Sequence, residues 1–108
     1  MASTIRIELQ PGFVPDGQGV RLCADDACHD GFISTSGPTG PLAGAAAPEL
    51  NGAPRRVRLS MTFGANQAPA ASGEITTHAI APGCQAAMVA AARFDPATRS
   101  LVESTWPR

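Results

Sequence analysis

The sequence contains no tyrosine and no lysine, and aromatic residues make up only 5% of its 108 residues. A protein that stacks the bases of single-stranded nucleic acid or the rings of sugars uses several aromatic side chains, so this scarcity argues against both functions. The formal net charge is −1 at pH 7. Because a nearly neutral chain supplies no field that attracts nucleic acid, we expect no nucleic-acid partner.

Long apolar runs are also missing. No stretch approaches the roughly 18 consecutive apolar residues of a membrane-spanning helix, so we expect no transmembrane segment in this chain. The start Met1-Ala2-Ser3 is not the charged and then apolar leader of a signal peptide, and it resembles a start introduced for expression. We therefore expect the natural protein to carry a signal peptide or lipid anchor that this sequence lacks.

The chain has three cysteines, Cys23, Cys28 and Cys84, and a length that suits one domain over residues 1–108. The short spacing of Cys23 and Cys28 predicts a disulfide between them, which leaves Cys84 as a small buried thiol. Two alternatives remain open: Cys84 pairs with one of the other two, or all three stay reduced. A disulfide indicates an oxidising compartment outside the cytoplasm.

Residues 21–30 are typical of a β-hairpin that turns at Asp25 and Asp26. In that register Cys23 faces Cys28 in a non-hydrogen-bonded pair, where the Cα atoms of two antiparallel strands lie closest. A looser four-residue loop would keep the pairing but make the cysteine pair a hydrogen-bonded one. The remaining predicted pairs are Ala24 with Ala27, Leu22 with His29, and Arg21 with Asp30.

Alternating apolar and polar residues predict further strands. The predicted strands are Thr4–Leu9, Val20–Ala24, Ala27–Thr35, Arg55–Phe63, Glu74–Ala81, Cys84–Asp95 and Arg99–Thr105. Residues 86–92 are rich in alanine, the best helix former, so a helix is the alternative there. Ser36–Pro54 contains four prolines and four glycines, which predicts one long loop that is a candidate binding surface.

About seven strands and one long loop, over residues 36–54, fit an all-β, immunoglobulin-like β-sandwich. Its core is predicted from the apolar face of each strand. The predicted core residues are Ile5, Ile7, Leu9, Val20, Leu22, Ile33, Val57, Leu59, Met61, Phe63, Met88, Phe94 and Leu101.

Four short motifs support a resemblance to a known group of proteins. They are Val20-Arg21-Leu22-Cys23 with Cys28 following, Val57-Arg58-Leu59, Pro82-Gly83-Cys84, and Arg93-Phe94-Asp95-Pro96. The chain resembles small uncharacterised extracytoplasmic β-domain proteins of high-GC actinobacteria, which are lipid-anchored or secreted. The resemblance implies a location in the cell envelope and assigns no catalytic residue.

Candidate metal ligands are scattered along the chain. Cys28, His29, His78 and Cys84 could hold a transition metal, although their spacing is not that of a structural zinc site. The carboxylates of Asp25, Asp26 and Asp30 could hold calcium at the hairpin tip, but acidic turn residues are more often solvated. We therefore expect no metal and no cofactor, a solvated His29, and Asp25 and Asp26 as a binding tip.

Catalytic residues can be paired only loosely. His78 could act as a base for Cys84, Ser60 or Ser72, but no motif brings a nucleophile, a base and an oxyanion site together. Arg55, Arg56 and Arg58 could meet an acidic partner, although arginines on the exposed side of a strand need none. The sequence therefore predicts a non-enzymatic module that binds a ligand or partner at the cell envelope. A metal-binding protein is the alternative, and a small thiol or hydrolytic enzyme comes after it.

Overall fold

A computed structural model describes residues 3–9, 20–34, 41–63, 71–79 and 87–104. Within these ranges the chain forms β-strands and one short 3-10 helix, η1 (Pro48–Leu50). The strands are β1 (Thr4–Glu8), β2 (Val20–Ala24), β3 (Ala27–Ser34), β4 (Leu42–Ala46), β5 (Arg56–Phe63), β6 (Ala71–Thr76), β7 (His78–Ala79), β8 (Met88–Asp95) and β9 (Ser100–Glu103).

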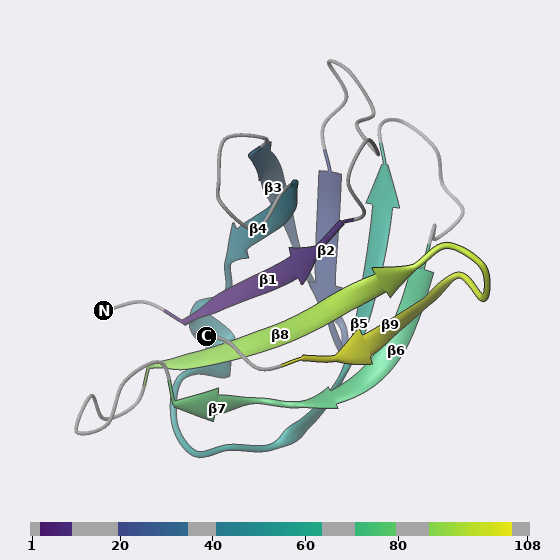
Figure 1. The fold of residues 1–108 in the computed structure, drawn as a ribbon. Helices are drawn as coiled ribbons and strands as arrows, with labels where there is room; N and C mark the ends of the chain where they lie inside the picture. The colour runs from purple at the N-terminus through teal and green to yellow at the C-terminus, as the bar shows by residue number, and fades with distance from the viewer. Residues whose placement is uncertain (1–2, 10–19, 35–40, 64–70, 80–86, 105–108) are drawn as a thin grey trace.

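The sheet closes on itself as an eight-strand β-barrel, so the predicted immunoglobulin-like sandwich is wrong. The strand order is β1-β4-β3-β2-β5-β6-β9-β8, and β8 then pairs with β1 in parallel (Figure 1). A second parallel contact joins β6 to β9 at Ser72 and Ser100. The short β7 extends the line of β6 and pairs with the start of β8. Closure leaves β1 hydrogen-bonded on both sides, whereas a sandwich would have left open sheet edges.

The predicted long loop over residues 36–54 is also wrong. Residues 36–40 lie outside the described ranges, but the rest contains β4 and η1. The five residues of β4 pair along their whole length with β1, from Leu42 opposite Glu8 to Ala46 opposite Thr4. Alanine and glycine have low strand propensity, so it is pairing with β1 and β3 that makes this segment a strand.

Most of the other predicted strands are confirmed. In β5 the apolar residues Val57, Leu59 and Met61 are buried and alternate with more exposed arginine, serine and threonine. Residues 88–95 form a strand, so the helical alternative is wrong for them, and residues 84–86 lie outside the described ranges. Both faces of β8 are buried from Met88 to Ala92, and its alanines let neighbouring segments pack closely on either side.

The core fills the barrel and contains every predicted core residue, with Ile33 and Phe63 only partly buried. The sequence prediction omitted Leu50 and Ile75, which have no exposed surface. Leu50 lies on η1, where the bonds from Leu50 N to Ala47 O (3.0 Å) and from Asn51 N to Pro48 O (3.1 Å) hold the turn. The segment predicted as a loop therefore supplies a core side chain.

The turn between β8 and β9 contains a strained residue. Arg99 has φ 52°, a left-handed conformation that costs an ordinary L-residue about 1 kcal/mol. We expect Arg99→Gly to raise the free energy of unfolding by about 0.5–1 kcal/mol, since glycine adopts this φ freely. Urea unfolding measures the change. Arg99→Ala is the matched control because it removes the same side chain and keeps the Cβ atom, and an equal gain from it would rule out backbone strain as the cause.

Candidate functional site

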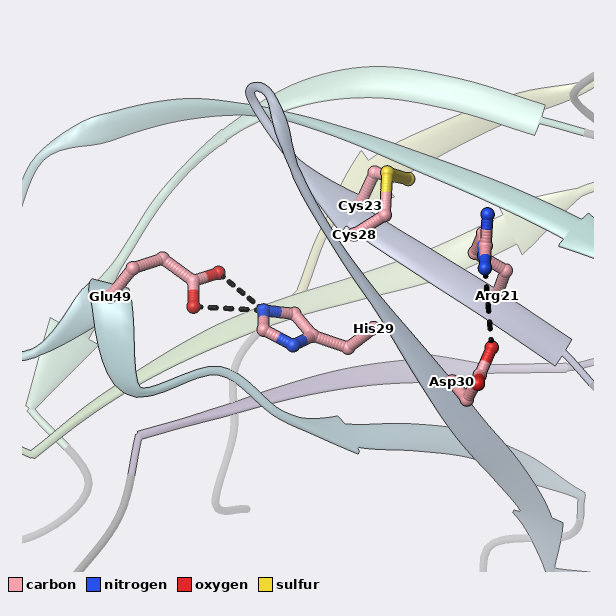
Figure 2. Close-up of a disulfide and its surroundings, with 6 residues drawn as sticks. All are labelled: Arg21, Cys23, Cys28, His29, Asp30 and Glu49. Carbon is pink, nitrogen blue, oxygen red and sulfur yellow. Dashed lines mark hydrogen bonds and ion pairs between the residues drawn. A yellow bond between two sulfur atoms is a disulfide. The ribbon is translucent and has the colours of Figure 1, made fainter.

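The β2–β3 hairpin has the predicted register, with Cys23 opposite Cys28 and Asp25-Asp26 as the turn. The predicted disulfide is present, and it joins two cysteines whose Cα atoms are 4.0 Å apart. Arg21 Nη2 lies 3.7 Å from Asp30 Oδ1 on the same outer face (Figure 2). Local turn chemistry therefore sufficed to predict this element from sequence.

Asp25 attaches the hairpin tip to β5. Its backbone has φ 53°, which aspartate tolerates better than most residues. Asp25 N donates to Arg58 O (2.8 Å), and Arg58 N donates to Asp25 Oδ1 (3.0 Å). Arg55 Nη1 lies 3.3 Å from the second carboxylate oxygen, Oδ2. The Asp25 side chain thus continues the β2–β5 ladder one step beyond the end of β2.

Three substitutions separate the two roles of Asp25. We expect Asp25→Ala to lower the free energy of unfolding by about 2 kcal/mol, because it loses the bond to Arg58 N and keeps an unfavourable φ. Asp25→Gly relieves the φ but still loses the bond, so about 1 kcal/mol is expected. Asp25→Asn keeps both an acceptor oxygen and the tolerance of φ, so little change is expected. Urea unfolding ranks the three, and equal losses from all of them would contradict the role of the bond.

A shallow, open depression of about 530 Å³ lies beside the hairpin tip. Arg56 Nε is 3.0 Å from Glu74 Oε2, and Arg58 Nη2 is 3.9 Å from Glu74 Oε1. Two guanidinium groups therefore share one carboxylate on this side of the depression, the Arg56–Arg58 wall. The residues that line the whole depression are Asp25, Asp26, Arg56, Val57, Arg58 and Glu74.

The hairpin tip forms the Asp25–Asp26 wall of the depression, and it carries the opposite charge. Asp25 is paired with Arg55, whereas within the described ranges no hydrogen bond or ion pair engages the Asp26 carboxylate. The depression is thus lined by one excess positive charge on the Arg56–Arg58 wall and by one excess negative charge at Asp26. The depression is polarised although its formal charge is close to zero.

On the inner face of the hairpin, His29 contacts η1. His29 Nε2 lies 2.8 Å from both carboxylate oxygens of Glu49, and the two side chains are only 26% and 27% exposed (Figure 2). Arg55 Nη2 also donates to Glu49 O at 3.3 Å. The expected solvated His29 is therefore wrong, because the turn that carries Glu49 covers this end of the hairpin. No sequence signal linked His29 to Glu49, which lay within the predicted loop.

The described members of the candidate metal site, Cys28, His29 and His78, are not arranged to hold a metal ion together. Cys28 is bonded to Cys23, His29 is occupied by Glu49, and His78 lies on β7, which does not neighbour β3 in the sheet. Cys84, expected as a buried thiol, lies outside the described residues. Among the residues with described positions, no group of three or more histidine, cysteine or acidic side chains is arranged to hold a metal ion.

The acidic residues of the hairpin also point to different partners. Asp25 binds Arg55 and the Arg58 amide, while Asp30 pairs with Arg21 on the outer face. Only Asp26 of the three keeps an unengaged carboxylate among the residues described. The predicted binding tip is thus reduced to Asp26, with arginines supplied by β5.

The candidate catalytic pairs are separated along the sheet. Ser60 and Ser72 face each other across β5 and β6. Ser72 and His78 are six positions apart in extended chain, which corresponds to about 20 Å at about 3.3 Å per residue. A base must lie within hydrogen-bond reach of its nucleophile, so His78 cannot serve either serine in this arrangement. The pairing with Cys84 falls outside the described residues.

Two further findings concern membrane-spanning helices and the comparison with known proteins. In the described part of the chain, no helix is long and apolar enough to cross a membrane. No protein-family model matches the sequence, no curated protein matches it, and no solved structure matches the fold. The geometry of the barrel and its hairpin tip is therefore the basis for a functional proposal.

Proposed function

We propose that this chain is a non-enzymatic binding module that acts outside the cytoplasm and holds a ligand carrying both a cationic and an anionic group. The ligand lies in the depression beside the hairpin tip. The observation that carries the proposal is the set of charges there: Arg56 and Arg58 share one carboxylate, and Asp26 lines the same depression without a partner among the described residues.

The chemistry of the two walls sets the ligand class. A carboxylate or phosphate on the ligand suits the planar guanidinium groups, which recognise such groups through paired hydrogen bonds. An ammonium group on the same ligand suits the Asp26 carboxylate. Because both walls are exposed, a ligand with only one charge binds weakly. A ligand that carries both charges contacts both walls and binds with higher affinity.

The proposed location rests on the disulfide and on the resemblance to extracytoplasmic actinobacterial proteins, either secreted or lipid-anchored. Disulfides persist mainly in oxidising compartments, and this one involves an exposed cysteine that a reducing cytoplasm would open. A metal-binding function is not proposed, since one of its four ligands is already bonded to another cysteine.

The experiment uses the zwitterionic dipeptide diglycine as a probe in an NMR titration of the full chain. We expect amide shifts at Asp26, Arg56 and Glu74 that saturate. Acetate alone and methylammonium alone should give smaller shifts at the same concentration, because each fills one wall only.

Two variants make the titration specific. Asp26→Asn keeps the shape of the tip and removes its charge, so we expect the dipeptide shifts to weaken several-fold. Asp30→Asn, at an acid outside the depression, is the matched control and should leave them unchanged. Equal shifts from acetate and diglycine, or equal losses in both variants, would overturn the proposal.

A further inference from the structure

We infer that the Cys23–Cys28 disulfide is a thiol-exchange site, opened in the folded protein by an external dithiol, and that its state controls the hairpin tip. The control of ligand binding rests on the proposed function above, whereas the exchange itself does not. The pair lies on the outer surface of the hairpin, with Cys28 exposed and Cys23 half-buried.

The disulfide is placed for access. Cysteine is usually among the most buried residues, and neither of these two belongs to the core cluster. The bridge closes a chain separation of only 5 residues across a hairpin that its own turn already defines. Such a short loop gains little chain entropy from a cross-link, so much of the fold's stability is independent of this bond.

The neighbouring charges distinguish the two sulfur atoms. On the outer face Cys23 follows Arg21 by two residues, and its cross-strand partner Ser60 follows Arg58 by two residues. Cys28 instead lies two residues from Asp26 in the turn, whose carboxylate has no partner among the described residues, and two residues from Asp30 on β3, which meets Arg21 only through an exposed contact of 3.7 Å. Cations favour a thiolate and carboxylates disfavour one, so Cys23 is the better leaving group. The greater exposure of Cys28 and the charges near Cys23 therefore both favour attack of an incoming thiolate on Cys28 Sγ.

The exchange balances as a two-electron transfer from the dithiol. The dithiol's thiolate attacks Cys28 Sγ, the Cys23–Cys28 bond breaks, and Cys23 Sγ leaves as a thiolate that takes up a proton. The second thiol of the reductant then attacks the reductant's first sulfur, which is bonded to Cys28 in the mixed disulfide, and this releases Cys28 as a thiolate. The reductant ends as a disulfide and the protein as two thiols.

The charges around Cys28 also select the partner. Asp26 and Asp30 repel an anionic thiol, and they attract a thiol that sits on a cationic surface. The exchange partner is thus a dithiol protein whose surface near the reactive thiol is positively charged. Among small thiols, cationic cysteamine should react faster than anionic glutathione.

Reduction of the disulfide changes the ligand depression because the turn that lines it is held between the two cysteines. Asp25 and Asp26 lie between the two cysteines, and Asp25 is tied to β5 by the paired bonds with Arg58. Without the cross-link the turn opens more often, which breaks those bonds and displaces the Asp26 wall.

The test uses the full chain with Cys84→Ser, so that only two thiols can appear. We expect mass spectrometry to show dithiothreitol opening the disulfide at least about tenfold faster than the chain unfolds, measured by urea jumps in parallel. Opening at the unfolding rate would overturn the proposal. Per thiolate present, cysteamine should exceed glutathione, and the reverse order would refute the assignment of Cys28 as the attacked sulfur.

A charge variant tests the role of Cys23. Arg21→Gln should slow opening several-fold, while Arg93→Gln, at an exposed arginine on β8, should not. Equal rates in both would overturn the assignment of the leaving group. After reduction, amide hydrogen exchange at Asp25 and Arg58 should rise by about tenfold with the other core strands unchanged. If the amides respond but diglycine binds neither form, the proposed ligand fails and the exchange site stands.

Discussion

Gly73→Ala is expected to lower the free energy of unfolding by about 3 kcal/mol, or to prevent folding outright. A Cβ atom at this position would lie 2.0 Å from Leu101 O and 2.9 Å from Leu101 C. Both are backbone atoms of β9, so no side-chain rotation relieves the clash and the two strands must separate. They meet in the parallel β6–β9 contact, which closes one seam of the barrel. Urea unfolding followed by circular dichroism measures the loss.

Substitutions at two other glycines test whether the loss of stability follows the steric clash of the added Cβ atom. At Gly31 the added Cβ would meet Gly44 O at 2.5 Å, again a backbone atom, so Gly31→Ala should also be costly. At Gly44 the nearest atom is Phe32 Cζ at 3.2 Å, the end of an exposed side chain that can move. Gly44→Ala should therefore cost least. A loss at Gly44 as large as that at Gly73 would contradict the steric explanation.

Leu50→Ala is expected to cost about 2–5 kcal/mol of unfolding free energy, the range for buried leucines that leave a cavity. Leu50 has no exposed surface and belongs to the core cluster, although it comes from a turn of only three residues. For a domain of this size each kcal/mol shifts the melting temperature by about 4–8 °C, so differential scanning calorimetry resolves the change.

The control for this prediction lies in the same turn. Pro48 is exposed, and Pro48→Ala changes only the stiffness of the chain there, so a loss of less than about 1 kcal/mol is expected. If residues 41–54 formed a loop outside the core, both substitutions would have small effects. Similar small losses of unfolding free energy in both variants would therefore show that this segment is a loop outside the core.

The strands that could be predicted from sequence carry their pattern locally. Alternation in residues 56–63 and the paired cysteines around Asp25-Asp26 each specify a face or a register within ten residues. β4 carries no such pattern, because it consists of one leucine followed by alanines and a glycine. It becomes a strand only by pairing with β1 and β3. Closure of the barrel depends on β1 meeting β8, and no local periodicity encodes a partner more than eighty residues away.

The candidate site divides in the same way. The turn acids and the disulfide were predicted because the hairpin is local. The sharing of Glu74 by Arg56 and Arg58, and the contact between His29 and Glu49, were missed because each joins elements that become neighbours only in the folded barrel. The arginines of β5 were recognised from sequence as exposed, but their acidic partners were not.

The parallel pairing of β1 with β8 has a consequence for the order of folding during synthesis. Thr4 lies opposite Val89, so the first strand leaves the ribosome long before its partner exists. Until residues 88–93 emerge, one side of β1 has no strand to pair with, and its backbone remains open to other chains. Such distant pairing makes folding slow, on the order of milliseconds to seconds, and places completion of the ring among the last events. A nascent chain released before these residues would hold the disulfide hairpin but not the barrel that supports it.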